Sequence, residues 1–199
     1  MSMNNQEALA QIGEEITNLT ASPLHAYRVE NGYFPVPGEG DPEADILFIG
    51  EAPGKNEAQT GRPFVGRAGS DLDALLQANG LERQDVFITN IVKDRPPGNR
   101  APTKAEIALY APYLIRQIEI IQPKVIATLG RFSMAFILRH FDLPEQSETI
   151  GTLHGRAIQA TTSFGEVILF PLYHPAAIFY NRKLEPELAA DFAKLVSLL

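Results

Sequence analysis

Residues 45–69 read DILFIGEAPGKNEAQTGRPFVGRAG, and this stretch decides the fold. An apolar strand passes into a loop that carries glycines, prolines, two acids and two arginines around a single phenylalanine, Phe64. Glycines let the backbone approach a ligand closely, and a simple strand-to-helix connection needs only about 2–6 residues. Because α/β proteins place their sites at the carboxyl ends of parallel strands, the stretch predicts a pocket floor for a flat ligand. The alternative is an ordinary loop with solvated charges.

Apolar runs alternate with helical patterns along the rest of the chain. This alternation predicts an α/β fold, a three-layer α/β/α sandwich around a central four-stranded, mainly parallel sheet. Residues 151–166 are expected to form a hairpin before the last strand. The predicted strands are Asp45–Gly50, Val86–Ile91, Val125–Leu129 and Val167–Leu172. The predicted helices are Gly66–Gln77, Thr103–Ile121, Arg131–Phe141 and Glu185–Leu198.

The chain is expected to form a single domain over residues 1–199. A helix near Gln6–Leu19 and an irregular segment to about residue 40 pack on it. Hydrophobic residues make up 45% of the chain and charged residues 21%, as in ordinary globular proteins. No apolar run approaches the ~20 residues that span a membrane, and the N-terminus lacks the features of a signal peptide. We therefore expect a cytoplasmic monomer.

A formal net charge of −7 argues against tight non-specific binding of nucleic acid. Eight of the 17 lysines and arginines are nevertheless clustered in three short segments. A local basic face on an acidic protein suits weak, salt-sensitive scanning of a nucleic-acid backbone. These segments contain Arg62 and Arg67, then Lys93, Arg95, Arg100 and Lys104, and finally Arg182 and Lys183.

Three motifs in order carry a resemblance to a known family. The first is Glu51–Gly54 with Gly61–Gly69, the second is TNIVKDRPPGNR at 89–100, and the third is HPAA at 174–177. From about Gly38 to the C-terminus, the chain resembles the family 4 uracil-DNA glycosylases. The resemblance implies an enzyme of base excision repair that hydrolyses the N-glycosidic bond of uracil and leaves an abasic site. Its partner would be uracil-containing DNA, single- or double-stranded.

Such an enzyme flips the nucleotide from the stack and then needs groups that hold and read the base. The resemblance assigns stacking to Phe64 and base reading to Asn90, whose amide matches the N3–H and O4 of uracil. It also places Ala52 and Glu57 at the base, with Glu57 at the C5 edge. From the residues alone, Phe64 also suits a core anchor and Asn90 suits a turn or cap.

Glu51 and His174 are the catalytic candidates. A neutral imidazole N–H of His174 directed at O2 would stabilise the departing uracil anion, and Glu51 would orient water and stabilise the sugar cation. The alternative for His174 is a structural histidine. DNA contacts are expected from the basic residues and from the loop after His174, where Ile178 or Phe179 either enters the base stack or belongs to the core. The predicted DNA-contacting residues are Arg62, Arg67, Lys93, Arg95, Arg100, Pro175, Ala176 and Ile178.

The chain departs from the family in having no cysteine. Family 4 enzymes hold a [4Fe–4S] cluster on four cysteines, and the resemblance places these positions at Asp94, Tyr110 and near Leu19 and Ser22. We therefore expect neither metal nor cofactor, burial of Tyr110 and Leu19, and pairing of Asp94 with an arginine. Two other functions stay open, a nucleic-acid-binding relative with little catalysis and a glycosylase for hypoxanthine or xanthine.

Overall fold

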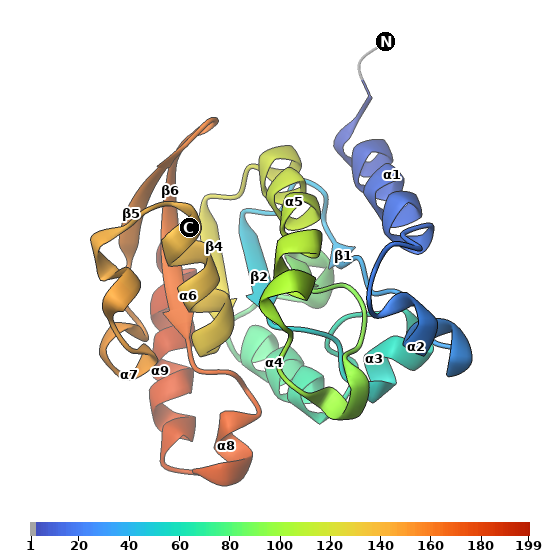
Figure 1. Cartoon of the computed structure of the whole chain (residues 1–199). Helices are drawn as coiled ribbons and strands as arrows, with labels where there is room; N and C mark the ends of the chain where they lie inside the picture. The colour runs from blue at the N-terminus through green and yellow to red at the C-terminus, as the bar shows by residue number, and fades with distance from the viewer. Residues whose placement is uncertain (1–2) are drawn as a thin grey trace.

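The fold is built on one mixed sheet, seen in a computed structural model that describes residues 3–199 (Figure 1). Within that range the sheet has six strands in the order β1-β3-β2-β4-β6-β5. The four inner strands are parallel, and β1 and β5 add antiparallel edges. The strands are β1 Glu39–Gly40, β2 Ile46–Gly50, β3 Phe87–Asn90, β4 Val125–Leu129, β5 Ile158–Thr162 and β6 Gly165–Leu172.

The expected parallel strands are confirmed, but the expected number of four is wrong. Strand β1 has only two residues, which is too short to leave a periodic signal in the sequence. The hairpin expected at 151–166 is partly present: β5 pairs antiparallel with β6, whereas the first part of that segment forms helix α7. The expected α/β class holds, with one additional strand at each edge of the sheet.

Helices connect the strands and cover the sheet. The long helices lie within two residues of their predicted ends at both termini, because apolar periodicity and caps mark them. Thr103, for example, forms the expected capping box with Glu106 at the start of α5. The helices are α1 Asn5–Thr17, α2 His25–Glu30, α3 Lys55–Thr60, α4 Arg67–Ala78, α5 Lys104–Ile121, α6 Arg131–His140, α7 Ile150–Leu153, α8 Ala177–Tyr180 and α9 Leu184–Val196.

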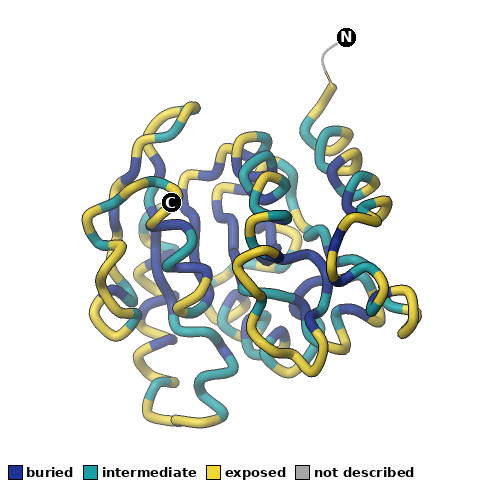
Figure 2. The backbone as a smooth tube through the Cα atoms, viewed as in Figure 1, coloured by how far each residue is buried: buried dark blue, intermediate teal, exposed yellow. Residues whose placement is uncertain are grey.

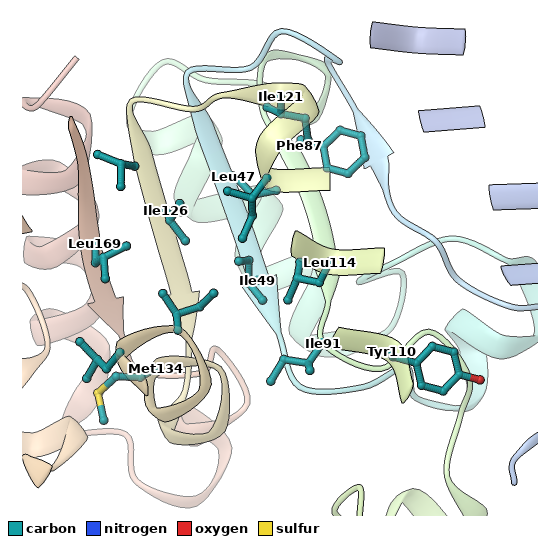
Figure 3. Close-up of a cluster of buried hydrophobic side chains, with 14 of the residues drawn as sticks. Leu47, Ile49, Phe87, Ile91, Tyr110, Leu114, Ile121, Ile126, Met134 and Leu169 are labelled. Atoms are coloured by element: carbon teal, nitrogen blue, oxygen red, sulfur yellow. The ribbon is translucent and has the colours of Figure 1, made fainter. Parts of the chain in front are cut away.

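The core consists of two layers, one on each face of the sheet, with the buried strands running through the middle (Figure 2). Side chains alternate between the faces because the period of a strand is two. Leu47 and Ile49 of β2 join the layer beneath α1, α5 and α6, which Figure 3 shows. Ile46 and Phe48 join the opposite layer beneath α4 and α9. A strand buried on both faces is therefore continuously apolar, as residues 46–49 are.

The N-terminal segment is docked on this core at several points. Helix α1 begins with a capping box between Asn4 and Glu7, and it buries Ile12 and Ile16 in the α5 layer. Further along, the backbone N–H of Val36 donates to the carbonyl of Lys93 at 2.7 Å. No helix in residues 3–199 is long and apolar enough to cross a membrane.

A buried polar network joins α2 and the loop after α1 to the rest of the protein. The Tyr110 hydroxyl donates to Oδ2 of Asp94 at 2.6 Å and lies 2.7 Å from the Ser22 hydroxyl. The Arg28 guanidinium contacts both Asp94 oxygens at 3.2 Å and also donates to the carbonyls of Ile16 and Thr17. The expected pairing of Asp94 with an arginine is confirmed, and its partner is Arg28.

This network occupies the positions that the family resemblance assigns to cluster cysteines. A cluster requires thiolate ligands, whereas Ser22, Tyr110 and Asp94 bond to one another, and Leu19 packs its alkyl side chain against the core. Burial and the neighbouring Asp94 carboxylate raise the pKa of Tyr110, so its phenol stays neutral. The residues present therefore do not fit an iron–sulfur cluster, and hydrogen bonds link the N-terminal segment to the core at this place.

We expect Asp94→Asn to lower the free energy of unfolding by about 3–5 kcal/mol, because it leaves the Arg28 charge buried without a counter-charge. Asp45→Asn is the matched control, since Asp45 forms an exposed ion pair with Lys124. Such a surface pair contributes about 0–1 kcal/mol. Urea denaturation of both variants measures the difference. Equal losses would show that the network does not hold the N-terminal segment.

Candidate active site

The carboxyl ends of the parallel strands bring the site residues together. Glu51 follows β2, Asn90 ends β3, Arg131 begins α6 just after β4, and His174 lies two residues beyond β6. The register places Gly50 of β2 directly beside Asn90. This edge is where parallel sheets place their ligands.

A cavity of about 430 Å³ opens at this edge. All of the predicted catalytic and base-binding residues line it, and among the predicted DNA-contacting residues Arg100 does so. The lining residues are Glu51, Ala52, Pro53, Gly54, Glu57, Phe64, Ala68, Asn90, Pro96, Asn99, Arg100, Ala101, Arg131, Phe132 and His174.

The floor of the cavity depends on the absence of a side chain at Gly50. A Cβ there would lie 2.3 Å from Oδ1 of Asn90 and 2.8 Å from the Phe64 ring. The backbone of Gly50 thus separates the aromatic ring from the amide without filling the space between them. Only glycine permits this approach.

Phe64 is held in a strained backbone conformation. Its φ is +50°, a region that non-glycine residues rarely adopt. The Arg83 guanidinium donates to the carbonyls of Pro63 and Phe64, and a Cβ at Gly69 would lie only 1.8 Å from the Phe64 carbonyl oxygen. Strain of this kind persists where the surroundings enforce it. The loop thereby holds the centroid of the Phe64 ring 5.7 Å from the centroid of the His174 ring.

Glu57 holds the same loop from within the cavity. Its Oε1 accepts hydrogen bonds from the backbone N–H groups of Val65, at 3.0 Å, and Gly66, at 2.8 Å. The carboxylate therefore fixes the segment that carries Phe64, a structural task that the sequence did not suggest. Its position in the cavity lining also leaves it beside a bound base.

Glu51 presents an unpaired carboxylate. Its Oε1 is buried and forms no hydrogen bond with any of the described residues. Burial raises the pKa of Glu51, whereas the positive charge of Arg131 acts in the opposite direction. A buried acceptor without a partner is costly, and it marks a group that receives its hydrogen bond from a substrate or from water.

His174 is arranged as a neutral hydrogen-bond donor. Its Nδ1 accepts from the backbone N–H of Ala176 at 3.1 Å, which leaves the proton of the neutral ring on Nε2. Burial lowers the pKa of His174 to about 4, although the nearby Glu57 carboxylate partly opposes the shift. At neutral pH the ring is therefore uncharged.

The Asn90 amide is free to bind a ligand. Asn90 is almost wholly buried, yet its side chain forms no hydrogen bond within residues 3–199. It shares the cavity lining with Phe64 and His174. The amide thus offers an unused donor and acceptor beside an aromatic face.

Most of the predicted DNA-contacting arginines already have partners. Arg62 forms a two-pronged ion pair with Glu39, and Arg100 forms one with Glu106. Arg95 donates to the Tyr33 hydroxyl at 2.8 Å and also to Asn99. The charges of Arg62 and Arg100 are therefore partly neutralised by the protein itself, whereas Arg95 bonds to uncharged groups.

The prediction that Lys93 contacts DNA is wrong. Its side chain is fully buried, at 0% exposure, and its ammonium lies among Thr89, Asn90 and Gln117. A group in the interior cannot reach a phosphate. Sequence gave no sign of this, because a lysine within a basic segment is ordinarily exposed.

The loop after His174 places three neighbouring large side chains in different surroundings. Ile178 packs against the core layer beneath α9, and the Phe179 ring lies 3.8 Å beneath the guanidinium carbon of Arg67. Tyr180, in contrast, is 92% exposed at the end of α8, which projects from the body of the protein (Figure 1). Pro175 is buried and Ala176 is half-buried.

Two residues of the site were not anticipated from the sequence. Arg83 fixes the Phe64 loop from a distant turn, and no local pattern indicates such a contact. Arg131 lines the cavity beside Glu51. It follows a predicted strand directly, so the rule that sites gather at the carboxyl ends of strands was a signal that pointed to it.

Comparison with known proteins agrees with this geometry. The profile of the Uracil DNA glycosylase superfamily matches residues 37–197. The chain is 45% identical to a type-4 uracil-DNA glycosylase of Sulfurisphaera tokodaii, over 95% of this chain and 84% of the relative. It is 42% identical to one of Archaeoglobus fulgidus, over 95% of this chain and 92% of the relative. A type-5 uracil-DNA glycosylase of Thermus thermophilus is 37% identical over 55% of this chain. The chain therefore belongs to the uracil-DNA glycosylase superfamily, with the type-4 enzymes.

Proposed function

We propose that this protein excises uracil from DNA by hydrolysing the N-glycosidic bond of a flipped nucleotide. The observation that carries the proposal is one cavity in which a buried aromatic ring, a free amide, an unpaired carboxylate and a neutral imidazole converge. The kinship with type-4 uracil-DNA glycosylases supports the same reaction. A binding protein without catalysis would have no need of the unpaired Glu51 carboxylate, whose burial is costly.

The base is held by an aromatic ring against its face and by a side-chain amide at its polar edge. Phe64, fixed by Arg83 and Glu57, supplies the aromatic face on which the ring stacks. The Asn90 amide reads the polar edge, because its donor and acceptor complement O4 and N3–H of uracil and oppose the pattern of cytosine. Gly50 leaves the space between the two.

Two residues have separate roles in cleavage of the N-glycosidic bond. His174 donates its Nε2–H to O2 of the departing uracil, and a neutral donor suits this task because it does not titrate near neutral pH. Glu51, whose anionic form is favoured by Arg131 against the effect of burial, stabilises the sugar cation and orients the attacking water. The C1′–N1 bond breaks first and the base leaves as its anion. Water then adds to C1′ of the sugar cation and gives its proton to the Glu51 carboxylate.

The DNA-facing surface surrounds the cavity mouth. Arg100 at the cavity, together with Arg67 beside the loop after His174, provides positive charge for the phosphates. Of the three apolar residues in that loop, Ile178 and Phe179 are engaged by the protein, which leaves Tyr180 as the aromatic residue that enters the stack vacated by uracil.

Single-turnover release of uracil from an oligonucleotide tests the reaction, with hypoxanthine and xanthine oligonucleotides as competing substrates. We expect release from uracil DNA, and His174→Ala to slow it roughly 10²–10³-fold, as the loss of one oxyanion donor does. With 5-fluorouracil, a better leaving group, the loss from His174→Ala shrinks, whereas the loss from Glu51→Ala stays the same. Equal responses of both variants to the leaving group would contradict the separate roles.

Folding stability should depend on the protonation of His174. Its folded-state pKa of about 4 lies below the ordinary value of 6.5, so the unfolded chain binds more protons between these values. The free energy of unfolding therefore falls as pH decreases from 6.5 to 4, by roughly 3 kcal/mol from this residue. Urea denaturation of the wild type and His174→Asn across this range measures it. The variant should lose this part of the slope, while His140 and the carboxylates with lowered pKa values keep theirs. An unchanged slope would contradict the neutral His174 ring.

Tyr180 should help to hold the DNA duplex open and should not affect cleavage of the N-glycosidic bond. Tyr180→Ala is expected to weaken excision from double-stranded DNA while excision from single-stranded DNA changes little, because only the duplex must be held open. Phe132→Ala is the control, since Phe132 is another exposed aromatic residue at the cavity. Fluorescence of 2-aminopurine opposite the flipped base reports the opening. Equal losses on both substrates would remove Tyr180 from this role.

A further inference from the structure

The buried Lys93 ammonium is bonded to the backbone of the residue that reads the base. Its Nζ donates to the Asn90 carbonyl at 2.8 Å, to the Thr89 hydroxyl at 2.6 Å and to Oε1 of Gln117 at 2.6 Å. No carboxylate lies within ion-pair distance of Nζ in the described part of the chain. Three uncharged acceptors therefore hold a lysine in the protein interior, an environment that lysine seldom occupies.

Hydrogen-bond counting indicates the charged form of this lysine. The Thr89 hydroxyl and the side-chain nitrogen of Gln117 both donate hydrogen bonds to the Pro37 carbonyl. The Thr89 and Gln117 side-chain oxygens can therefore only accept hydrogen bonds from Nζ. Three acceptors require three N–H donors, and a neutral amine has two. Burial lowers the pKa of Lys93, and the three acceptors counteract it by favouring the ammonium.

Lys93 takes the place of a missing strand partner. On the side of β3 away from β2, β1 pairs only with Phe87 and Ile88, so the ladder ends before Asn90. The Asn90 carbonyl would otherwise lack a backbone donor on that side. A lysine three residues later folds back beneath the end of the strand and supplies the donor.

We propose that Lys93 is a positioning residue, whose ammonium clamps the Asn90 carbonyl and thereby fixes the side-chain amide that discriminates uracil from cytosine. The Asn90 side-chain amide has no hydrogen-bond partner among residues 3–199, so its orientation depends on the backbone that Lys93 holds. The proposal rests on the proposed function, because it assigns base reading to Asn90. The proposal predicts that loss of the hydrogen bond between Lys93 and the Asn90 carbonyl lowers the rate of uracil release and the discrimination between uracil and cytosine.

Lys93→Met removes the donors and the charge while keeping the length of the side chain. We expect kcat for uracil release to fall on the order of 10²-fold, as for a small misplacement of a catalytic group. The KM for DNA should stay unchanged, because Lys93 is remote from the surface. Release of cytosine relative to uracil should rise. Asn90→Asp is the positive reference, because it replaces the amide donor by an acceptor that suits the amino group of cytosine.

Gln117→Met is the matched control. It breaks a different hydrogen bond of the same ammonium and disturbs the same core, but it leaves the bond between Nζ and the Asn90 carbonyl in place. Compared at a temperature where both variants are folded, Gln117→Met should keep wild-type discrimination. Equal effects of the two variants would overturn the clamp and leave Lys93 a purely structural residue.

A measurement on the wild type covers the case in which Lys93→Met does not fold. In protein labelled with ¹⁵N at lysine Nζ, the protected Lys93 signal should shift when free uracil is added. An unmoved signal at saturating uracil would overturn the proposal. Failure of the wild type to release uracil from DNA would instead contradict the proposed function, so the two failures are distinguishable.

Discussion

The hydrogen-bonded register of the parallel strands is the constraint on which the site depends. Because β2 and β3 pair with Gly50 opposite Asn90, the Phe64 loop and the base-reading amide meet across a residue that has no side chain. The same sheet sets β4 beside β6, so Arg131 and His174 arrive at the same edge. A slip of one residue would turn each of these side chains to the wrong face.

The cavity gathers polar groups that have no protein partner among the described residues. Buried polar side chains elsewhere form hydrogen bonds, as in the network of Asp94, Tyr110 and Arg28, except for Oδ2 of Asp71 and Oγ1 of Thr128. At the cavity, the Glu51 carboxylate and the Asn90 side-chain amide form no hydrogen bond with the described residues. The unpaired Glu51 oxygen is costly to bury, and a bound nucleotide with its water would give both groups partners, so that these hydrogen bonds contribute to recognition.

The rigid surroundings of these groups come from residues that never touch a substrate. Arg83 and Glu57 hold Phe64 in a backbone conformation that it would rarely adopt without them. Lys93 donates a hydrogen bond to the Asn90 carbonyl, beyond the point where the pairing of β1 with β3 ends. The N-terminal segment contributes as well, because the Pro37 carbonyl closes the network around Lys93. Stability of the segment before β2 and geometry of the site are therefore linked.

The sequence by itself determined the α/β class, the four inner strands and the long helices, since periodicity and caps are local features. Through the family resemblance of its motifs it also pointed to Glu51, Phe64, Asn90 and His174, which line one cavity in the structure. The tertiary structure alone decided the edge strands, the burial of Lys93, the anchoring by Arg83 and the pairing of Asp94 with Arg28. These depend on contacts between residues far apart in the chain, and no local pattern records whether a lysine or an arginine will meet water or a buried acceptor.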